Sequence, residues 1–358
     1  MLYSPDLAIA VPALYCGVKA IAESIARCPI MEMNGQDKEV KSSAFMELLK
    51  RPNNYQNRFE FIESMVRNVV LRGNAYIYDE DKVNLHLLKP DNEDTKIIWK
   101  NRDRYYKTNL PTRITGNPMP VVRTLTMDEV THIKGPSDDN LYGYDNLLLF
   151  ANTFEVHISA VQMGLDFFNN SGRPSGIVNI KDSSLTAQQI NALADAWRKN
   201  NALGKGRSST VFLKGVDNMQ YTTIGTSPTE GQFIPSQEHI IREVARILNI
   251  SPTKLHDLSR ASYNNITQES LDFIEDTIKP LVARVEAGLS ELVPRNNRVV
   301  IDTNVLTSET RLDRYKAYLI GVKGGWLSPE QVAEIEGIPI EEVKKDVEQE
   351  QDNYLTNN

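Results

Sequence analysis

One predicted helix, spanning residues 145–169, carries apolar residues on two sides instead of one. Both sets recur at helical spacings of three and four residues, and a polar strip separates them. A helix on the surface of one core needs a single apolar stripe. Two stripes beside a polar edge favour a helix between neighbours with one edge facing water, as around a hydrated channel. A central helix of one large core gives the same periodicity and remains an alternative. The first stripe is Phe150, Phe154, Ile158, Val161, Leu165 and Phe168; the second is Val156, Ala160, Met163 and Phe167; the polar strip is Asn152, Glu155, Ser159, Gln162 and Asp166.

The chain has 358 residues, enough for a substantial core or for two or three modules that share one. Its 41% hydrophobic and 24% charged residues are typical of an ordinary soluble protein. The longest apolar run, residues 7–18, is short for a membrane span and contains Pro12. A secretory signal would have basic residues before its apolar run, and no Lys or Arg precedes this one. We therefore expect a soluble, cytosolic chain with no membrane partner.

Charge is distributed unevenly along the chain. Residues 330–358 contain nine acidic residues and two lysines, so this segment accounts for the formal net charge of −7. Residues 1–329 balance at 38 basic and 38 acidic residues, and residues 173–225 lean basic. No segment has the dense positive stripe of a sequence-reading DNA-binding protein. Any contact with DNA is therefore expected to be weak and non-specific.

Signatures of catalysis and metal binding are few. The turn at residues 204–208 has the wrong register for a phosphate-binding loop, which disfavours an ATP-driven motor. Cys16 and Cys28 fall in one predicted helix about 18 Å apart, too far for a disulfide, and no second Cys/His pair completes a zinc site. The acidic run at residues 79–81 could join His86 in a metal site, although an acidic turn explains it more simply. No cofactor, metal or catalytic residue is predicted.

Periodicity and turn residues predict an α+β chain in which a small insert separates two long helices. Pro280 lies inside the predicted helix 267–292 and is expected to kink it. The predicted helices are 8–27, 59–71, 145–169, 186–200, 236–249, 267–292, 308–321 and 328–336. The predicted strands are 75–78, 84–88, 96–99, 121–125, 130–133, 176–180, 210–213, 219–223 and 298–302.

Eight short stretches, in this order, resemble the portal proteins of long-tailed double-stranded-DNA bacteriophages and prophages. The most recognisable is LRGNAY at residues 71–76, and FFNNSGRPSG at 167–176 matches a helix end of that family closely. Each stretch is weak alone, but their number and order are specific and span almost the whole chain. The other six are VPALYC at 11–16, IARCPI at 25–30, LLKRPN at 48–53, NLYG at 140–143, EVARILNISP at 243–252 and GWLSPE at 325–330.

The resemblance implies a portal fold and a division of the chain. The chain begins close to the family's first helix, so an N-terminal extension would be absent or trimmed, and its short C-terminal part implies a small crown. The implied parts are a wing (1–144), a first stem helix (145–172), a small α/β clip (173–225), a second stem helix (226–250), a tunnel loop (251–266), a kinked long helix with a wing strand (267–304), and a short helical crown with an acidic C-terminal tail (305–358).

The resemblance further implies a structural role and not an enzymatic one. The chain would form a homo-oligomeric ring of about twelve subunits, a DNA channel at one capsid vertex of the virion, assembled in the cytoplasm of the bacterial host. The implied partners are double-stranded DNA without sequence specificity, the terminase, the head–tail adaptor, and the major capsid and scaffold proteins.

Functional positions follow from the same resemblance. The two apolar stripes of the first stem helix would contact neighbouring subunits on both sides. In the tunnel loop, Lys254, Arg260, Ser262 and Tyr263 are the predicted DNA-facing positions. In the clip, Lys199, Lys205 and Arg207 are predicted to contact DNA or partners. A solvated loop, with no ligand, remains the simpler alternative for both groups.

Two other functions remain open from the sequence. A metal-dependent nuclease, or another enzyme with a cryptic acidic site, would use Asp79 and Asp81. A ring subunit of a non-phage secretion device would share the double-striped helix but would need no central loop that touches DNA.

Overall fold

The computed structural model describes residues 8–80, 82–90, 94–169, 176–180, 186–189, 191–192, 195, 211–214, 220–223, 233–257, 263–306 and 311–336. The chain divides into two compact units, residues 1–304 and residues 305–358. Helices and strands are mixed, which confirms the predicted α+β class.

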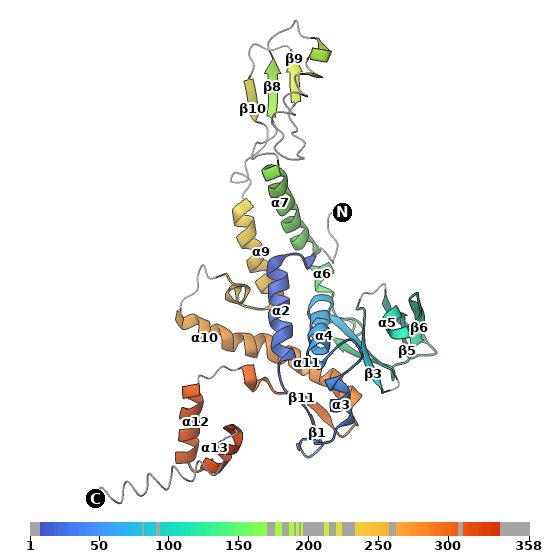
Figure 1. Ribbon diagram of the computed structural model, residues 1–358, viewed down its shortest axis with the longest axis vertical. Coiled ribbons are helices and arrows are strands. Elements are labelled where there is room, and N and C mark those ends of the chain that lie inside the picture. The colour runs from blue at the N-terminus through green and yellow to red at the C-terminus, as the bar shows by residue number, and fades with distance from the viewer. Residues whose placement is uncertain are drawn as a thin grey trace, which may run out of the picture. The chain divides into compact units, whose positions relative to one another are not determined.

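Two helices, α2 (Pro12–Ala26) and α4 (Arg58–Arg72), pack against each other in the first unit (Figure 1). α2 begins with a proline, whose missing N–H costs nothing in the first helical turn. α4 begins with a capping box between Asn57 and Glu60 and ends at Gly73 in the left-handed conformation. Each helix buries one apolar stripe, and each fully buried Leu, Ile or Phe side chain contributes about 1.5–3 kcal/mol. The buried apolar side chains are Leu14, Val18, Ile21 and Ile25 on α2 and Phe61, Ile62, Met65, Val66 and Val69 on α4.

Among the described residues four small sheets lie in the same unit, and one of them falls between residues 176 and 223. β2 (Asn74–Glu80) pairs antiparallel with β3 (Asn84–Leu88) on one side and β7 (Val130–Lys134) on the other. β5 (Asp103–Leu110) lies between β4 (Thr95–Lys100) and β6 (Val121–Leu125). The third sheet pairs β1 (Ile30–Met33) with β11 (Arg298–Ile301), far apart in sequence. The first two sheets share a core of Tyr76, Tyr78, Leu88, Tyr106, Leu110, Leu125 and Val130.

The LRGNAY stretch brings three backbone segments into contact. Gly73 has φ of 67°, and a Cβ there would lie 2.1 Å from the carbonyl oxygen of Tyr144. A Cβ on Gly143 would lie 2.0 Å from the Gly73 carbonyl oxygen, so no side chain fits at either position. The buried Asn74 joins the same segments, because its amide donates to the carbonyls of Arg72 (2.9 Å) and Gly143 (3.0 Å). The end of α4, the start of β2 and the turn before α6 (Asn146–Leu149) are thereby fixed together.

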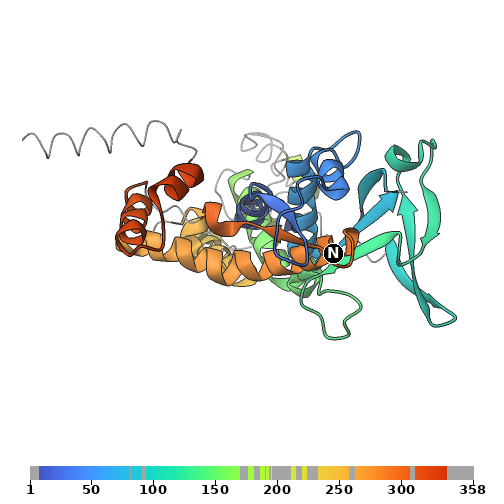
Figure 2. The ribbon, with the colours of Figure 1, turned by 90° about the horizontal axis from the view of Figure 1, so that it is seen from below.

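The predicted long helix contains a change of helix type. α10 (Tyr263–Asp272) continues through a π-helical turn, η2 (Phe273–Ile278), into α11 (Lys279–Leu289) and a last 3-10 turn, η3 (Ser290–Leu292). Pro280 has no N–H to donate and its ring conflicts with a carbonyl four residues earlier, so the wider turn accommodates it. Figure 2 shows this long helix crossing the base of the unit, where α11 contacts β7 and β11.

The remaining elements are short. α3 (Ala44–Lys50) is capped by the Ser43 hydroxyl, and α5 (Thr112–Thr115) ends at Gly116. In the second unit, α12 (Arg311–Lys323) is followed by a turn and α13 (Pro329–Glu336), and the Tyr318 hydroxyl donates to Glu336 at 3.1 Å. η4 (Thr303–Leu306) is a 3-10 turn that ends in this unit. The acidic tail beyond residue 336 lies outside the described residues. No helix among the described residues is long and apolar enough to cross a membrane.

The buried histidine His132 should make the stability of the protein depend on pH. Its Nε2 donates to Asn74 Oδ1 at 3.0 Å, while its Nδ1 is buried without a hydrogen-bond partner in the described structure. Burial, followed by the nearby charges of Lys134 and Arg104, lowers the pKa of His132 to about 3 from 6.5. The unfolded chain therefore binds a proton that the folded chain excludes between these values.

We expect the free energy of unfolding to fall as pH decreases from 6.5 towards 3, with His132 contributing up to about 1.4 kcal/mol per pH unit. His132→Gln, which cannot titrate, should flatten that slope in urea unfolding curves measured across the pH range. An unaltered slope in the His132 variant would show that this group is not the origin.

The contact between Gly143 and Gly73 predicts a steric effect on stability. Gly143→Ala should lower the free energy of unfolding by about 3 kcal/mol or more, because the new methyl group meets backbone that cannot rotate away. Gly116→Ala is the control: Gly116 ends α5 with φ of 68°, so a side chain there is strained, but a Cβ meets no atom within 4 Å. We expect about 1 kcal/mol for the control from backbone strain alone. Equal losses in chemical denaturation would contradict this explanation.

Candidate subunit interface and nucleic-acid-facing segment

Two helices, α7 (Ala151–Asn169) and α9 (Phe233–Leu248), lie side by side and extend from the wing elements (Figure 1). They correspond to the predicted helices 145–169 and 236–249. The first is interrupted at Phe150, where α6 ends, so the sequence placed the start of the long helix too early. The Asp145 carboxylate accepts hydrogen bonds from the N–H groups of Leu147 and Leu148 and thereby caps α6.

The base of α7 is attached to α4 through polar contacts. Arg72 and Asp145 form an ion pair at 3.1 Å in which both side chains are mostly buried. The Asn146 amide donates to the Val70 carbonyl at 2.8 Å. The direction in which α6 and α7 leave the wing is therefore set by α4.

The apolar residues of α7 differ strongly in burial. Phe154 is only 1% exposed, so the lower end of the first stripe packs inside the subunit. Val156 is 68% exposed, Met163 49% and Leu165 51%, which leaves members of both stripes on the surface. Phe150, Ile158, Ala160 and Val161 are half-buried, and the side chain of Phe167 lies outside the described residues. Several exposed apolar side chains on one helix make α7 a candidate interaction surface.

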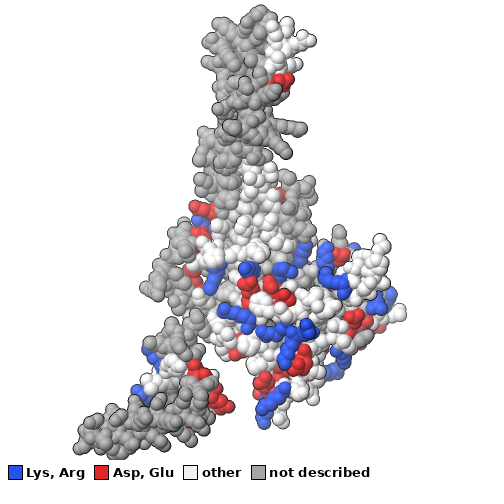
Figure 3. Space-filling view, in the orientation of Figure 1, with Lys and Arg blue, Asp and Glu red and all other residues white. Residues whose placement is uncertain are grey.

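α7 also has few charges. Its sequence contains two acidic residues, Glu155 and Asp166, and no basic residue. In Figure 3 the described part of this helix is nearly free of charged atoms, whereas the wing below it carries both signs. His157 is buried on the same helix, and burial lowers its pKa, so it is neutral near pH 7. The helix can therefore enter a protein–protein interface without a large cost of desolvating charge.

The second helix, α9, keeps its cations in local ion pairs. Arg242 bonds Glu238 at 3.3 Å, and Arg246 bonds Glu243. Its apolar side, formed by Ile240, Val244, Ala245 and Leu248, is buried. α9 packs on α2, where Gly17 permits a close approach to Leu248.

The predicted tunnel loop is partly regular structure. Residues Pro252–Leu255 form a 3-10 turn, η1, and Tyr263 is the first residue of α10. The Lys254 ammonium donates to Ser270 Oγ at 3.3 Å and lies 5.1 Å from the centre of the Phe273 ring. Ser251 Oγ donates to Glu269 at 2.8 Å, so the segment is attached to the start of the long helix at two points. Arg260 and Ser262 lie outside the described residues, and the predicted DNA contact of all four positions stays a prediction.

The predicted clip contains a small sheet. β8 (Gly176–Ile180) pairs parallel with β9 (Val211–Lys214) and antiparallel with β10 (Gln220–Thr223). These strands match the three predicted there. Lys199, Lys205 and Arg207 lie outside the described residues, so their predicted contacts also stay predictions.

Asp81, which the alternative metal site would use together with Asp79, lies outside the described residues. His86 Nε2 lies 3.2 Å from Glu80 Oε2, and Asp79 accepts a hydrogen bond from the Lys82 N–H at 2.8 Å. Burial lowers the pKa of His86. No group of three or more His, Cys, Asp or Glu side chains among the described residues could hold a metal ion. The hydrogen bond from Lys82 shows that Asp79 stabilises the turn that follows β2.

Known proteins resemble the chain over most of its length. Residues 12–337 match the family described as "Phage portal protein". The chain is 21% identical over 356 residues to the probable portal protein of Streptomyces phage phiC31, covering 92% of this chain and 75% of that protein. It is 24% identical to the portal protein of Enterobacteria phage HK97, covering 79% of this chain and 65% of that one.

Solved structures show the same fold. A chain in the neck of an empty gene transfer agent particle superposes with a TM-score of 0.62 at 20% identity, covering 94% of both chains. An HK97-family portal protein from Corynebacterium diphtheriae superposes with a TM-score of 0.58 at 15% identity, covering 86% of this chain and 97% of that one. The match over residues 12–337 shows that the chain belongs to the phage portal protein family.

Proposed function

We propose that this chain is a structural subunit of a portal ring, and that the ring encloses the DNA channel at one vertex of the capsid. The observation that carries the proposal is the exposure of apolar residues on α7 in a single subunit. Val156, Met163 and Leu165 are each about half exposed or more, although α9 already packs against this helix.

A ring explains this surface better than a two-fold dimer. A two-fold interface buries the same patch on both partners, so one exposed stripe would suffice. A ring joins two different patches of each subunit, one to each neighbour, and closes without leaving a free edge. The two stripes of α7 supply two such patches, and the low charge of the helix suits both. A ring of about twelve subunits is the expectation that comes with the family resemblance.

The charge pattern supports a channel that lets DNA slide. Tight binding to phosphates requires many unpaired Lys and Arg side chains and makes affinity steeply dependent on salt. Here the cations of α9 are paired with carboxylates, and Lys254 is engaged with Ser270 and Phe273. We propose that Lys254, Arg260, Ser262 and Tyr263 lie along the channel, and that Lys199, Lys205 and Arg207 lie at its outer mouth. Binding there would be weak and independent of DNA sequence.

The remaining partners follow from the family. We propose that the ring docks the terminase during genome packaging, later carries the head–tail adaptor, and contacts the major capsid and scaffold proteins at the vertex. Particle assembly would take place in the cytoplasm of the bacterial host. The relatives named as portal and neck proteins support this placement in a particle. In this role the chain carries out no chemical step itself, and the terminase supplies the energy of packaging.

The ring proposal makes a prediction about assembly. Val156→Lys with Met163→Lys places two charges per subunit on the exposed sides of α7 and should abolish ring formation, because an unpaired charge is costly to bury. Val122→Lys with Met127→Lys is the matched control, since Val122 and Met127 are 58% and 52% exposed and lie outside the stem. Native mass spectrometry with negative-stain imaging should show closed rings for the unmodified chain and the control, and monomers for the stem variant.

Two results would contradict the proposal. Rings that persist in the stem variant would show that α7 does not form the interface. A stable two-fold dimer of the unmodified chain that buries α7 would exclude the ring and favour another function. Both double variants should keep the melting temperature of the isolated subunit, because the replaced side chains are exposed.

A further inference from the structure

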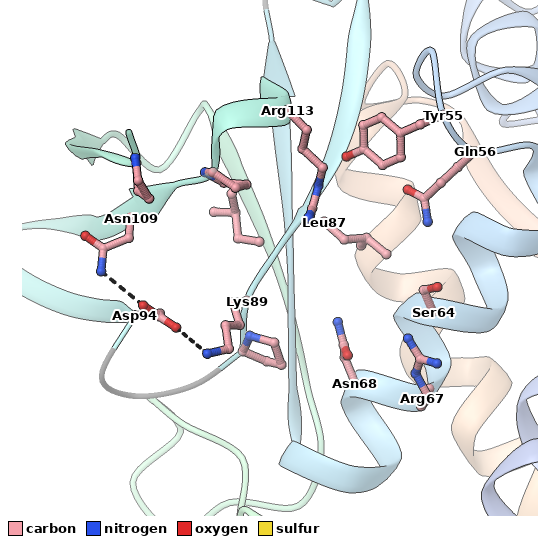
Figure 4. A pocket seen from close by; sticks show the side chains of 14 residues that line it. Tyr55, Gln56, Ser64, Arg67, Asn68, Leu87, Lys89, Asp94, Asn109 and Arg113 are labelled. Atoms are coloured by element: carbon pink, nitrogen blue, oxygen red, sulfur yellow. Dashed lines mark hydrogen bonds and ion pairs between the residues drawn. The ribbon is translucent and has the colours of Figure 1, made fainter. Parts of the chain in front are cut away.

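A separate pocket of about 600 Å³ lies in the wing. α4 forms one wall, α5 and the adjoining end of β5 form the opposite wall, and Leu87 and Leu88 of β3 lie at the bottom (Figure 4). All of these elements belong to the first unit, and none is part of the stem. Its volume is within the range of sites that hold small molecules or inserted peptide side chains.

Hydrogen-bond donors converge on this pocket from both walls. On α4, Ser64 and Asn68 are four residues apart and therefore share a face, with Arg67 beside them. From the opposite wall, Arg113 extends toward Leu87 and Tyr55 (Figure 4). No carboxylate pairs with Arg67 or Arg113 among the residues that the structure describes. Two guanidinium groups without a counter-ion therefore line one concave surface.

Arg113 is held in position before any ligand arrives. Its guanidinium lies 5.4 Å from the centre of the Tyr55 ring, a cation–π contact that leaves the N–H edges of the group available. The Tyr55 hydroxyl in turn lies 3.2 Å from His86 Nδ1, and His86 bonds Glu80. A preorganised guanidinium loses less entropy when it binds, so this arrangement favours recognition over a freely moving surface arginine.

The acidic residue that lines the pocket is already satisfied. Asp94 bonds Lys89 at 2.8 Å and Asn109 at 3.0 Å, as the dashed lines in Figure 4 show. The hydrogen bonds from Lys89 and then Asn109 hold the pKa of Asp94 below its ordinary value, so it is ionised near pH 7. Three cations thus face one carboxylate, and the pocket carries a net positive charge.

We propose that this pocket binds an acidic peptide segment of a partner protein, with an Asp or Glu carboxylate held between Arg113 and the Arg67–Asn68 turn of α4. Planar carboxylates match the fork of a guanidinium, and the Asn68 amide adds an uncharged donor. The apolar surface of Leu87, Pro111 and Pro120 would receive an apolar side chain next to the acidic one. This site is independent of the proposed ring function, because none of its residues lies on α7 or α9.

Duplex DNA is a poorer fit to the same charges. Its phosphates lie on a rigid rod, so they could meet Arg67 and Arg113 at the rim of the pocket but could not reach Leu87. A peptide side chain can enter a concave site and use both the donors and the apolar surface. The shape of the pocket therefore favours a peptide, and DNA becomes an outcome that the experiment distinguishes.

The test uses the full chain and two labelled peptides of alternating Leu and Glu, or Leu and Gln, measured by fluorescence anisotropy at low salt. The Glu peptide should bind and the Gln peptide should not. Arg67→Gln with Arg113→Gln should weaken binding by about tenfold or more, because two charge-assisted interactions are lost. Asn68→Leu should weaken binding several-fold without changing the charge. Arg295→Gln, an exposed arginine outside the pocket, should have no effect.

Several outcomes would overturn the proposal. These are no binding of the Glu peptide, equal binding of both peptides, or equal binding by the unmodified chain and the Arg67/Arg113 double variant. A labelled DNA duplex whose binding is lost in the double variant, with peptide binding retained, would assign the guanidinium groups to nucleic acid instead. Native mass spectrometry of the same samples reports ring formation separately, so a failed peptide site and a failed ring are told apart.

Discussion

The arrangement of the first unit depends on the buried side chain of Asn74. Its amide donates to the carbonyls of Arg72 and Gly143, and its Oδ1 accepts from the Gly143 N–H at 2.8 Å and from His132. Each of these groups, buried without a partner, would cost about 1–3 kcal/mol. Asn supplies both donors and acceptors from one short side chain, which neither Asp nor Leu can do. One residue therefore holds together a helix end, a strand and the turn that leads to α7.

The paired helices α7 and α9 are both attached to the wing where glycine permits close approach. Gly73 and Gly143 bring the backbone before α6 against the end of α4, and Gly17 brings α2 against Leu248 of α9. At these glycines the neighbouring atoms lie too close for even one added methyl group. The two helices therefore have little freedom to tilt against α2 and α4. The exposed apolar residues of α7 are consequently presented in fixed positions. Subunits that repeat around a closed ring need such fixed positions at their interfaces, because small errors in each interface accumulate and prevent closure.

Sequence periodicity was sufficient for the long elements and insufficient for the contacts between them. The helices near residues 8–27 and 59–71 were predicted because apolar residues recur every three or four positions along them. β5 was missed because its alternation is carried by charged and polar residues as much as by Tyr106 and Leu110, and β1 because four residues give too short a pattern. α3 has only seven residues and was also missed. Pro280 was expected to kink the helix. In the structure a π-helical turn precedes it, and this turn buries Phe273 and Ile278.

The candidate sites divide in the same way, because a site on one helix can be predicted from periodicity and a site between elements cannot. The double-striped helix predicted an interface, which stays a prediction; Val156 and Met163 are exposed in the single subunit. The wing pocket could not be predicted, because its walls come from α4, β3 and α5, which are separated by turns whose geometry the sequence does not specify. The resemblance to a family predicted a stem from short motifs. No motif marks Arg67 and Arg113, which come to line one pocket only in the folded chain.

The placement of charge separates two kinds of contact in this protein. Along α9 each arginine has a carboxylate partner within one turn, so little positive charge remains to hold phosphates tightly. In the wing pocket, Arg67 and Arg113 share a concave surface whose one lining acid already bonds Lys89 and Asn109. Paired cations suit a surface past which a polyanion must slide, because each bond formed to DNA would also have to be broken as the strand advances. Unpaired cations beside apolar side chains suit a partner that binds and stays. The two charge patterns lie on different elements, so the proposed channel and the proposed peptide site do not make opposite demands on the same residues.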